Sequence, residues 1–138
     1  MVCPRTGDIF VTDGYGNSSV HHLRADGSHV RSWGEPGTDA GAGLGRETFR
    51  GPPLPRRPLV CSSADGRAVA GQFNCPHNIA ILDAPGDSRR RLAVCDRENM
   101  RVQIYTMEGE LVASWHLHRP VAICAVSHII LAEVCAAV

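Results

Sequence analysis

Residues 71–81 read GQFNCPHNIAI and residues 92–99 read LAVCDREN, and these two segments decide the fold. Each contains a short apolar run, and the turn between them is rich in Gly, Asp and Pro, a pattern typical of two paired β-strands. The four residues from Asp96 to Asn99 follow the second strand and are expected to be too polar for a core. Because strand ends carry sites in β-architectures, His77 and Arg97 are candidate functional residues.

The composition favours a turn-rich β protein. The chain has 138 residues, enough for one domain with a core, and its 14 Gly and 9 Pro residues disfavour a helical bundle. It also permits partial disorder. Fourteen acidic and fourteen basic residues give a net charge of zero, so no overall electrostatic attraction to nucleic acid or to a membrane surface is expected.

Six cysteines are scattered along the chain without a Cys-x-x-Cys spacing, so neither a zinc knuckle nor a redox motif is indicated. They are Cys3, Cys61, Cys75, Cys95, Cys124 and Cys135. Their even number permits disulfide bonds, and the connectivity stays open. The first residues hold no apolar run of signal-peptide length, and polar residues interrupt the most apolar segment, residues 120–138. We therefore expect neither a signal peptide nor a membrane-spanning segment in this chain.

A pattern of strand, polar turn, strand, hairpin and strand occurs twice. Six residues of the first copy recur in the second. The pairs are Asp13 and Asp96, Val20 and Val102, Leu23 and Tyr105, Gly27 and Gly109, Val30 and Val112, and Trp33 and Trp115. From the first Val pair to the Trp pair the offset is constant at 82 residues, and the Asp pair is offset by 83. A short β unit that recurs in this way favours a repeat fold, with a partial β-propeller as the leading candidate.

The spacing of the two copies predicts that the chain holds only some of the blades of a propeller. The offset is about twice the roughly 40–50 residues of one blade. Residues 35–70, between the copies, lack periodicity and are rich in Gly, Pro and Arg, as expected for a loop or disordered insertion. We predict the end of one blade in residues 1–34, a complete blade in 71–117 and the start of a third in 118–138, where Pro120 follows Pro76 by 44 residues. Such an array leaves strand edges open, so we expect the chain to be a piece of a larger protein.

Three short sequence motifs resemble those of a known protein family. They are Asp-Gly-Tyr-Gly-Asn-Ser at 13–18, Gly-Gln-Phe-Asn-Cys-Pro-His-Asn at 71–78 and Asp-Arg-Glu-Asn at 96–99. With the Ser-Trp-Gly of residues 32–34, they resemble NHL-repeat blades, and among these the lyase domain of the peptidylglycine α-amidating monooxygenase family. The resemblance covers about residues 7–34 and 71–134. Each motif alone is weakly specific, but the three motifs in this order distinguish this family well.

The resemblance implies a six-bladed propeller, of which this chain would hold two to three blades. It implies a peptidylamidoglycolate lyase, which cleaves a peptidyl-α-hydroxyglycine into a peptide amide and glyoxylate in the C-terminal amidation of secreted peptides. The family uses a zinc ion bound by three histidines, a catalytic tyrosine, arginines that hold the substrate carboxylate, and a structural calcium ion. From their positions in the matching motifs, the resemblance implies that Tyr15 is the catalytic tyrosine and that His77 is one zinc ligand. It implies that Arg97 is a catalytic and substrate-binding arginine. The implied location is the secretory pathway or the extracellular space.

These residue types suit that reaction. Breaking the C–N bond requires removal of the hydroxyl proton, and zinc stabilises the resulting negative charge on oxygen. A tyrosine is a weak base at neutral pH unless a nearby cation favours the phenolate. The planar guanidinium of an arginine binds a carboxylate better than an ammonium group does.

Each candidate also has a structural interpretation. A histidine after a proline is commonly a surface residue, a tyrosine between glycines a turn residue, and an arginine between two acids part of a surface ion-pair cluster. The other histidines give no metal site, because His21 and His22 are adjacent on a strand and point to opposite faces. His116 and His118 share a face but are expected to be exposed.

Departures from the family pattern leave other functions open. Gly16, Ala93 and Ile104 occupy positions where the family has paired cysteines, so its disulfides do not transfer to this chain. The other two histidine ligands belong to blades that this chain is not expected to contain. A non-catalytic NHL-repeat binding module and an inactive, truncated lyase copy are therefore alternatives, and we expect no lyase turnover from these 138 residues alone.

Overall fold

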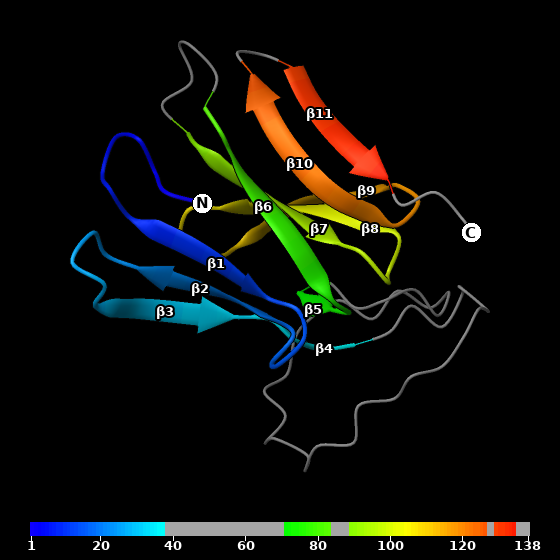
Figure 1. Ribbon diagram of the computed structural model, residues 1–138, viewed down its shortest axis with the longest axis horizontal. Helices are drawn as coiled ribbons and strands as arrows, with labels where there is room; N and C mark the ends of the chain where they lie inside the picture. The colour runs from blue at the N-terminus through cyan, green and yellow to red at the C-terminus, as the bar shows by residue number, and fades with distance from the viewer. Residues whose placement is uncertain (38–70, 84–88, 127–128, 135–138) are drawn as a thin grey trace.

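The computed structural model describes residues 1–37, 71–83, 89–126 and 129–134, and these residues form β-strands and turns (Figure 1). No helix occurs among them, which confirms the predicted all-β class. The described residues therefore contain no helix that could cross a membrane. Most of the predicted insertion, residues 38–70, lies outside the described residues. The first residues assigned to it form β4 (Glu35–Pro36), which pairs in parallel with β5 (Gln72–Phe73).

The largest described sheet has four strands, which follow one another in the chain and pair antiparallel. They are β6 (Pro76–Leu82), β7 (Arg91–Asp96), β8 (Arg101–Thr106) and β9 (Leu111–His116). Five of the six residues are buried in each of β7 and β8. Both faces of the sheet are therefore covered at β7 and β8, whereas β9 at its edge is mostly exposed.

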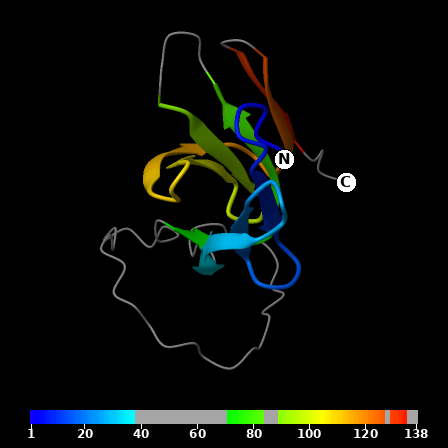
Figure 2. The same cartoon turned by 90° about the vertical axis from the view of Figure 1, so that its left-hand side faces the viewer.

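Two smaller sheets flank the central one. β1 (Ile9–Asp13), β2 (Ser19–Leu23) and β3 (His29–Trp33) form an antiparallel sheet, and β10 (Pro120–Val126) pairs with β11 (Ile129–Val134). β1 and β10 contact β6 from its two sides, and Figure 1 shows these three strands across one face of the molecule. Figure 2 shows the rest of the central sheet extending behind them. The described sheets are open rather than closed on themselves.

Two apolar clusters hold the three sheets together. One lies between the central sheet and the β1–β3 sheet and comprises Cys3, Phe10, Val20, Phe73, Ile79, Ile81, Leu92, Val94 and Tyr105. The other reaches β10 and comprises Ala80, Ala93, Cys95, Val102, Ile104 and Ile123. Successive residues of a strand point to opposite faces, which is why Ile79 and Ala80 belong to different clusters. Each fully buried large apolar side chain contributes about 1.5–3 kcal/mol to folding.

The strand register confirms the predicted repeat. Val20 pairs with Trp33 in the first sheet, and Val102 pairs with Trp115 in the central sheet. A register shift in the β2–β3 pairing recurs, 82 residues later, in the β8–β9 pairing. The two copies therefore share their irregularities as well as their strands.

Candidate functional site

The structure places His77 at a β-bulge at the beginning of β6. The residues on either side of it pair with Asp96 and Cys95, which are adjacent, so His77 is the extra residue of the bulge. Its side chain is exposed, and its Nδ1 lies 2.7 Å from the carbonyl oxygen of Val121. A carbonyl oxygen only accepts hydrogen bonds, so Nδ1 donates and the neutral ring keeps its lone pair on Nε2. Nε2 is thus the nitrogen that could bind a metal ion.

The beginning of β10 repeats the beginning of β6. Val121 is the extra residue of a second bulge, 44 residues after His77. Before each proline stands a non-glycine residue with positive φ, Cys75 at 57° and Arg119 at 37°. Such residues are uncommon, so their recurrence confirms that the two strand beginnings correspond, as the prolines predict. The unusual backbone belongs to the repeat, not to His77 alone.

The turn between β1 and β2 brings Tyr15 to His77. Asp13 shapes this turn, since its Oδ1 accepts a hydrogen bond from the Gly16 amide at 2.9 Å. Its Oδ2 accepts another from Asn17 Nδ2 at 2.6 Å. Tyr15 is 79% exposed, and its ring meets the His77 ring edge to face, with centroids 6.5 Å apart and planes at 72°. Two of the three predicted site residues are therefore in contact.

Close approach of this turn to β6 explains Gly14. A Cβ atom there would lie 2.6 Å from the carbonyl oxygen of Pro76, a rigid backbone atom.

The Asn17 side chain, together with the Gly16 amide, holds the pKa of Asp13 below its ordinary value. The carboxylate that shapes the turn is therefore ionised at neutral pH.

Arg97 is held near the same place by its main chain. Its amide nitrogen lies 3.4 Å from the carbonyl oxygen of Cys75, and the Glu98 amide donates to the carbonyl oxygen of Asn74 at 3.0 Å. The Arg97 side chain is partly buried, and its Nε lies 3.3 Å from Glu98 Oε1. The turn after β7 is thus joined to the segment that leads into β6, and its arginine faces the neighbouring glutamate.

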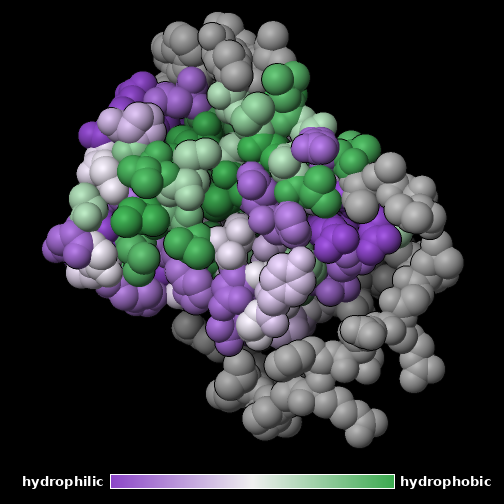
Figure 3. Space-filling view, in the orientation of Figure 1, coloured by the Kyte–Doolittle hydropathy of each residue, from purple (hydrophilic) through white to green (hydrophobic). Residues whose placement is uncertain are grey.

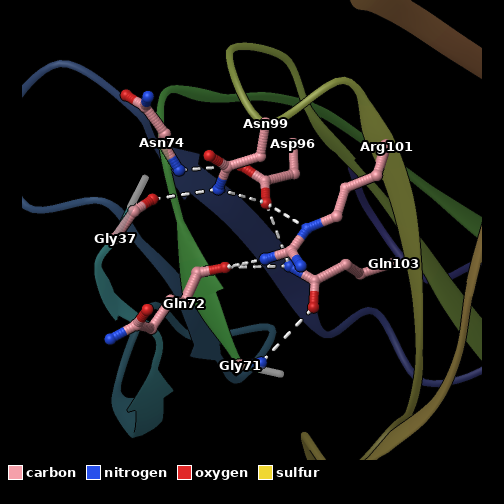
Figure 4. Close-up of polar contacts among 8 residues, drawn as sticks. All are labelled: Gly37, Gly71, Gln72, Asn74, Asp96, Asn99, Arg101 and Gln103. Carbon is pink, nitrogen blue, oxygen red and sulfur yellow. Dashed lines mark hydrogen bonds and ion pairs between the residues drawn. The ribbon is translucent and has the colours of Figure 1, made fainter. Parts of the chain in front are cut away.

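The expectation that residues 96–99 are too polar for a core is wrong for two of the four. Asp96 is 0% exposed and Asn99 is 1% exposed. They are buried because Asp96 has four hydrogen-bond donors (Figure 4). Its Oδ1 accepts from the Asn74 amide at 2.7 Å. Its Oδ2 accepts from Asn99 Nδ2 at 2.9 Å, Arg101 Nε at 2.7 Å and Gln103 Nε2 at 3.2 Å.

This buried network also fixes the chain that leads into β6. Arg101 Nη2 and Gln103 Nε2 both donate to the carbonyl oxygen of Gln72, at 2.7 and 3.0 Å (Figure 4). Burial raises the pKa of Asp96, while the Arg101 charge opposes that rise. Sequence reasoning missed this cluster, although polar residues at alternate positions of an otherwise apolar strand, 101 and 103, were a signal for it.

A second missed contact joins Glu98 to Arg119. Arg119 Nη2 lies 2.9 Å from Glu98 Oε1 and 2.8 Å from Oε2, across 21 residues of sequence. Glu98 therefore lies between two arginines, Arg97 and Arg119. No local sequence signal pairs Glu98 with Arg119, because the contact depends on how β10 packs beside the central sheet.

The orientation of His21 and His22 and the exposure of His116 and His118 are as the sequence predicted. His22 stacks on Phe10 with ring centroids 4.4 Å apart, while His21 hydrogen bonds to Ser32 at 2.7 Å, so the two rings leave the strand on opposite sides. His116 and His118 are exposed. Within the described residues, no three His, Cys, Asp or Glu side chains are grouped to hold a metal ion.

A hollow of about 380 Å³ lies beside His77, between β1, β6 and β10. It is lined mainly by apolar side chains, with His77, Thr12 and Asn78 as its polar members. The full lining is Met1, Phe10, Val11, Thr12, His77, Asn78, Ile79 and Ile123. Figure 3 shows apolar residues gathered on this face of the molecule. The histidine therefore lies beside an open recess that is lined by both apolar and polar groups.

Comparison with known proteins gives consistent relatives. The chain is 32% identical over 112 residues to peptidyl-glycine alpha-amidating monooxygenase B of Xenopus laevis, an alignment that spans 80% of this chain and 9% of that protein. It is 30% identical over 102 residues to the mouse peptidyl-glycine alpha-amidating monooxygenase, spanning 74% and 7%. The chain is similar to peptidylglycine alpha-amidating monooxygenases. It spans less than a tenth of the length of these relatives, and no family model matches it.

Proposed function

We propose that this chain forms part of a zinc-dependent peptidyl-α-hydroxyglycine α-amidating lyase, built as a β-propeller of NHL-type blades. In this proposal β1–β3 are the end of one blade, β6–β9 a complete blade, and β10–β11 the start of a third. The shared register of the sheets and the similarity to amidating monooxygenases support it. The observation that carries it is the contact between Tyr15 and a His77 whose Nδ1 is fixed by a backbone carbonyl.

His77 is suited to be one zinc ligand. Metal-binding histidines usually donate their second ring N–H to a carbonyl or carboxylate, as His77 donates Nδ1–H to Val121. Catalytic zinc needs three protein ligands, and the resemblance assigns the other two to further blades. Bound zinc supplies a Lewis acid that stabilises negative charge developing on oxygen. The described residues hold no cluster of side chains suited to the structural calcium.

The chain's own residues have distinct tasks in the proposed reaction. Tyr15 takes the proton of the substrate hydroxyl. The deprotonated oxygen then forms a C=O bond as the C–N bond breaks, the C–N electron pair goes to the amide nitrogen, which takes the proton back from Tyr15, and peptide amide and glyoxylate result. Arg97 binds the carboxylate of the hydroxyglycine. The substrates are peptides that end in α-hydroxyglycine, and the place of action is the secretory pathway or the extracellular space.

A chimera tests this function. The matching 112 residues of the Xenopus laevis relative are replaced by those of this chain, and zinc content and glyoxylate release from an α-hydroxyglycine peptide are measured. We expect activity in the chimera, and loss of zinc with a rate decrease of more than about 100-fold in His77→Ala. His116→Ala, which changes an exposed histidine of β9, is the matched control and should alter neither.

Two outcomes would overturn the proposal. A chimera that binds no zinc, or a His77→Ala chimera that keeps both zinc and rate, would favour a non-catalytic binding module instead. The 138-residue chain by itself is expected to release no glyoxylate, because one histidine cannot hold a catalytic zinc ion.

A further inference from the structure

Two histidine rings converge on one serine hydroxyl in the β2–β3 hairpin. His21 Nδ1 lies 2.7 Å from Ser32 Oγ, and His29 Nε2 lies 2.8 Å from the same oxygen. His29 and Ser32 are exposed, and the His21 side chain is 30% exposed, so solvent and ions reach this cluster. The sequence neighbour of His21, His22, stacks on Phe10 on the opposite side of β2. The imidazole that can act together with His21 is therefore His29.

The register shift in the β2–β3 pairing brings the two rings to one face. The residues on either side of Val30 pair with His22 and Leu23, which are adjacent, so Val30 is the extra residue of β3. Successive side chains of a regular strand alternate between faces, so positions 29 and 32 would otherwise point to opposite sides. The extra residue reverses this alternation, and His29 consequently lies beside Ser32.

The repeat does not require these two imidazoles. The second copy has Gln103 where the first has His21, and Leu111 where the first has His29. The second copy nevertheless shares the register shift, so the same backbone forms there without either histidine. The pair is therefore a property of the β1–β3 sheet alone, and glutamine and leucine are side chains that this backbone accepts.

Asp13 faces the other nitrogen of the His21 ring. His21 Nε2 lies 3.2 Å from Ser19 Oγ and 3.7 Å from Asp13 Oδ2. A carboxylate on this side favours the tautomer that carries its proton on Nε2 and leaves the lone pair on Nδ1, toward Ser32. Metal-binding histidines usually have a carboxylate or a carbonyl group behind the ring in this way.

We propose that His21 Nδ1 and His29 Nε2 bind a divalent transition metal ion, with Ser32 and water completing its coordination. Imidazole nitrogen is a preferred ligand of zinc, copper and nickel ions. Because a zinc–nitrogen bond is about 2.0–2.1 Å long, an ion between the rings requires each nitrogen to move by less than about 1 Å from its present position. His29 is exposed, so its proton can move to Nδ1 and leave Nε2 free for the ion.

The bound ion would join β2 to β3. It shares no ligand with His77, so this inference does not depend on the proposed lyase function.

The test is a titration of the 138-residue chain with Ni²⁺, followed by NMR in the ring signals of the individual histidines, which paramagnetic Ni²⁺ broadens. We expect the signals of His21 and His29 to broaden together, over one range of Ni²⁺ concentration. His21→Gln, which installs the residue of the second copy, should raise the concentration that broadens the His29 signal about tenfold or more. His29→Leu should do the same for the His21 signal.

Two controls accompany the titration. Mg²⁺, which prefers oxygen ligands, should leave the shifts of both rings unchanged. His118→Ala removes an exposed histidine after β9 and should not alter the response of His21 or His29 to Ni²⁺.

Either of two results would overturn the inference. One is broadening of the two signals over separate concentration ranges, and the other is a folded His21→Gln protein whose His29 signal responds as in the original chain. If His21→Gln does not fold, His29→Leu decides, because it removes one of the two ligands at an exposed position. An unchanged response of His21 in that variant would likewise exclude a shared ion.

Discussion

The two repeated aspartates show how one position in a β repeat can be used in two ways. Asp96 is completely buried and contacts Arg101 at 2.7 Å. Asp13, its counterpart, is partly exposed, and Ser19 stands where the second copy has Arg101. In each copy an asparagine side chain donates a hydrogen bond to the aspartate. Asn17 donates to Asp13 at 2.6 Å, and Asn99 donates to Asp96 at 2.9 Å. Only the buried carboxylate requires a full counter-charge, because water solvates the other.

Replacing Asp96 should be severely destabilising. Asp96→Asn is expected to lower the free energy of unfolding by about 3–5 kcal/mol, since it leaves the Arg101 charge buried without its carboxylate. The double variant Asp96→Asn, Arg101→Met should cost less than Asp96→Asn alone, because it removes both charges. Asp83→Asn, at an exposed ion pair with Arg5, should cost at most about 1 kcal/mol. Denaturant titrations measure all three, and a double variant no more stable than Asp96→Asn would contradict the argument.

Asp13 gives the stability a defined pH dependence. Its pKa is lowered in the folded protein, chiefly by the Asn17 hydrogen bond. Such a group stabilises the fold above its unfolded pKa of about 3.9, and the stabilisation is lost as pH falls through the folded pKa. Asp13→Asn should therefore lower the free energy of unfolding at neutral pH and have less effect toward about pH 3. Unfolding curves of both proteins across this range test it, and a pH-independent difference would exclude the mechanism.

At the scale of the strands, local pattern explains what the sequence could predict. Apolar alternation and turn residues are local signals, and they predicted the repeat, the strand beginning at Pro76 and its counterpart at Pro120. The bulge that presents His77 depends on how β6 pairs with β7, which no local signal contains. The same holds for burial, since Asp96 is buried and Glu98, two residues later, is partly exposed. Long-range pairing decided each feature that the sequence missed.

The turn after β1 gives an element-scale prediction. Gly14→Ala should lower the free energy of unfolding by about 1–3 kcal/mol, because the new methyl group meets the Pro76 carbonyl oxygen. Moving the turn away should also separate the Tyr15 ring from His77, which ring-current shifts of the His77 signals would report. Gly27→Ala is the control, because it meets no atom within 4 Å and pays only for its φ of +84°, about 1–2 kcal/mol. A Gly14→Ala protein with unchanged His77 shifts would contradict this account.

At the scale of the whole molecule, the packing is uneven. β7 and β8 of the central sheet are covered on both faces, but β11 pairs only with β10 among the described residues and exposes apolar side chains. These are Ile130 at 37%, Leu131 at 55% and Val134 at 43% exposure. An open strand edge with apolar neighbours is a surface on which chains associate. The net charge of zero provides no long-range repulsion to oppose that association.

Self-association should therefore respond to a single charge on β11. Leu131→Lys is expected to shift the protein toward monomer and to change the free energy of unfolding by less than about 0.5 kcal/mol, because the side chain is mostly exposed. Sedimentation at several protein concentrations, with denaturant titration beside it, measures both effects. Leu92→Lys places the same charge in the fully buried centre of β7 and should prevent folding. If Leu131→Lys associates as strongly as the original protein, the β11 edge is not the contact surface, and another edge strand, β9 with the exposed Val112 and Trp115, becomes the next to test.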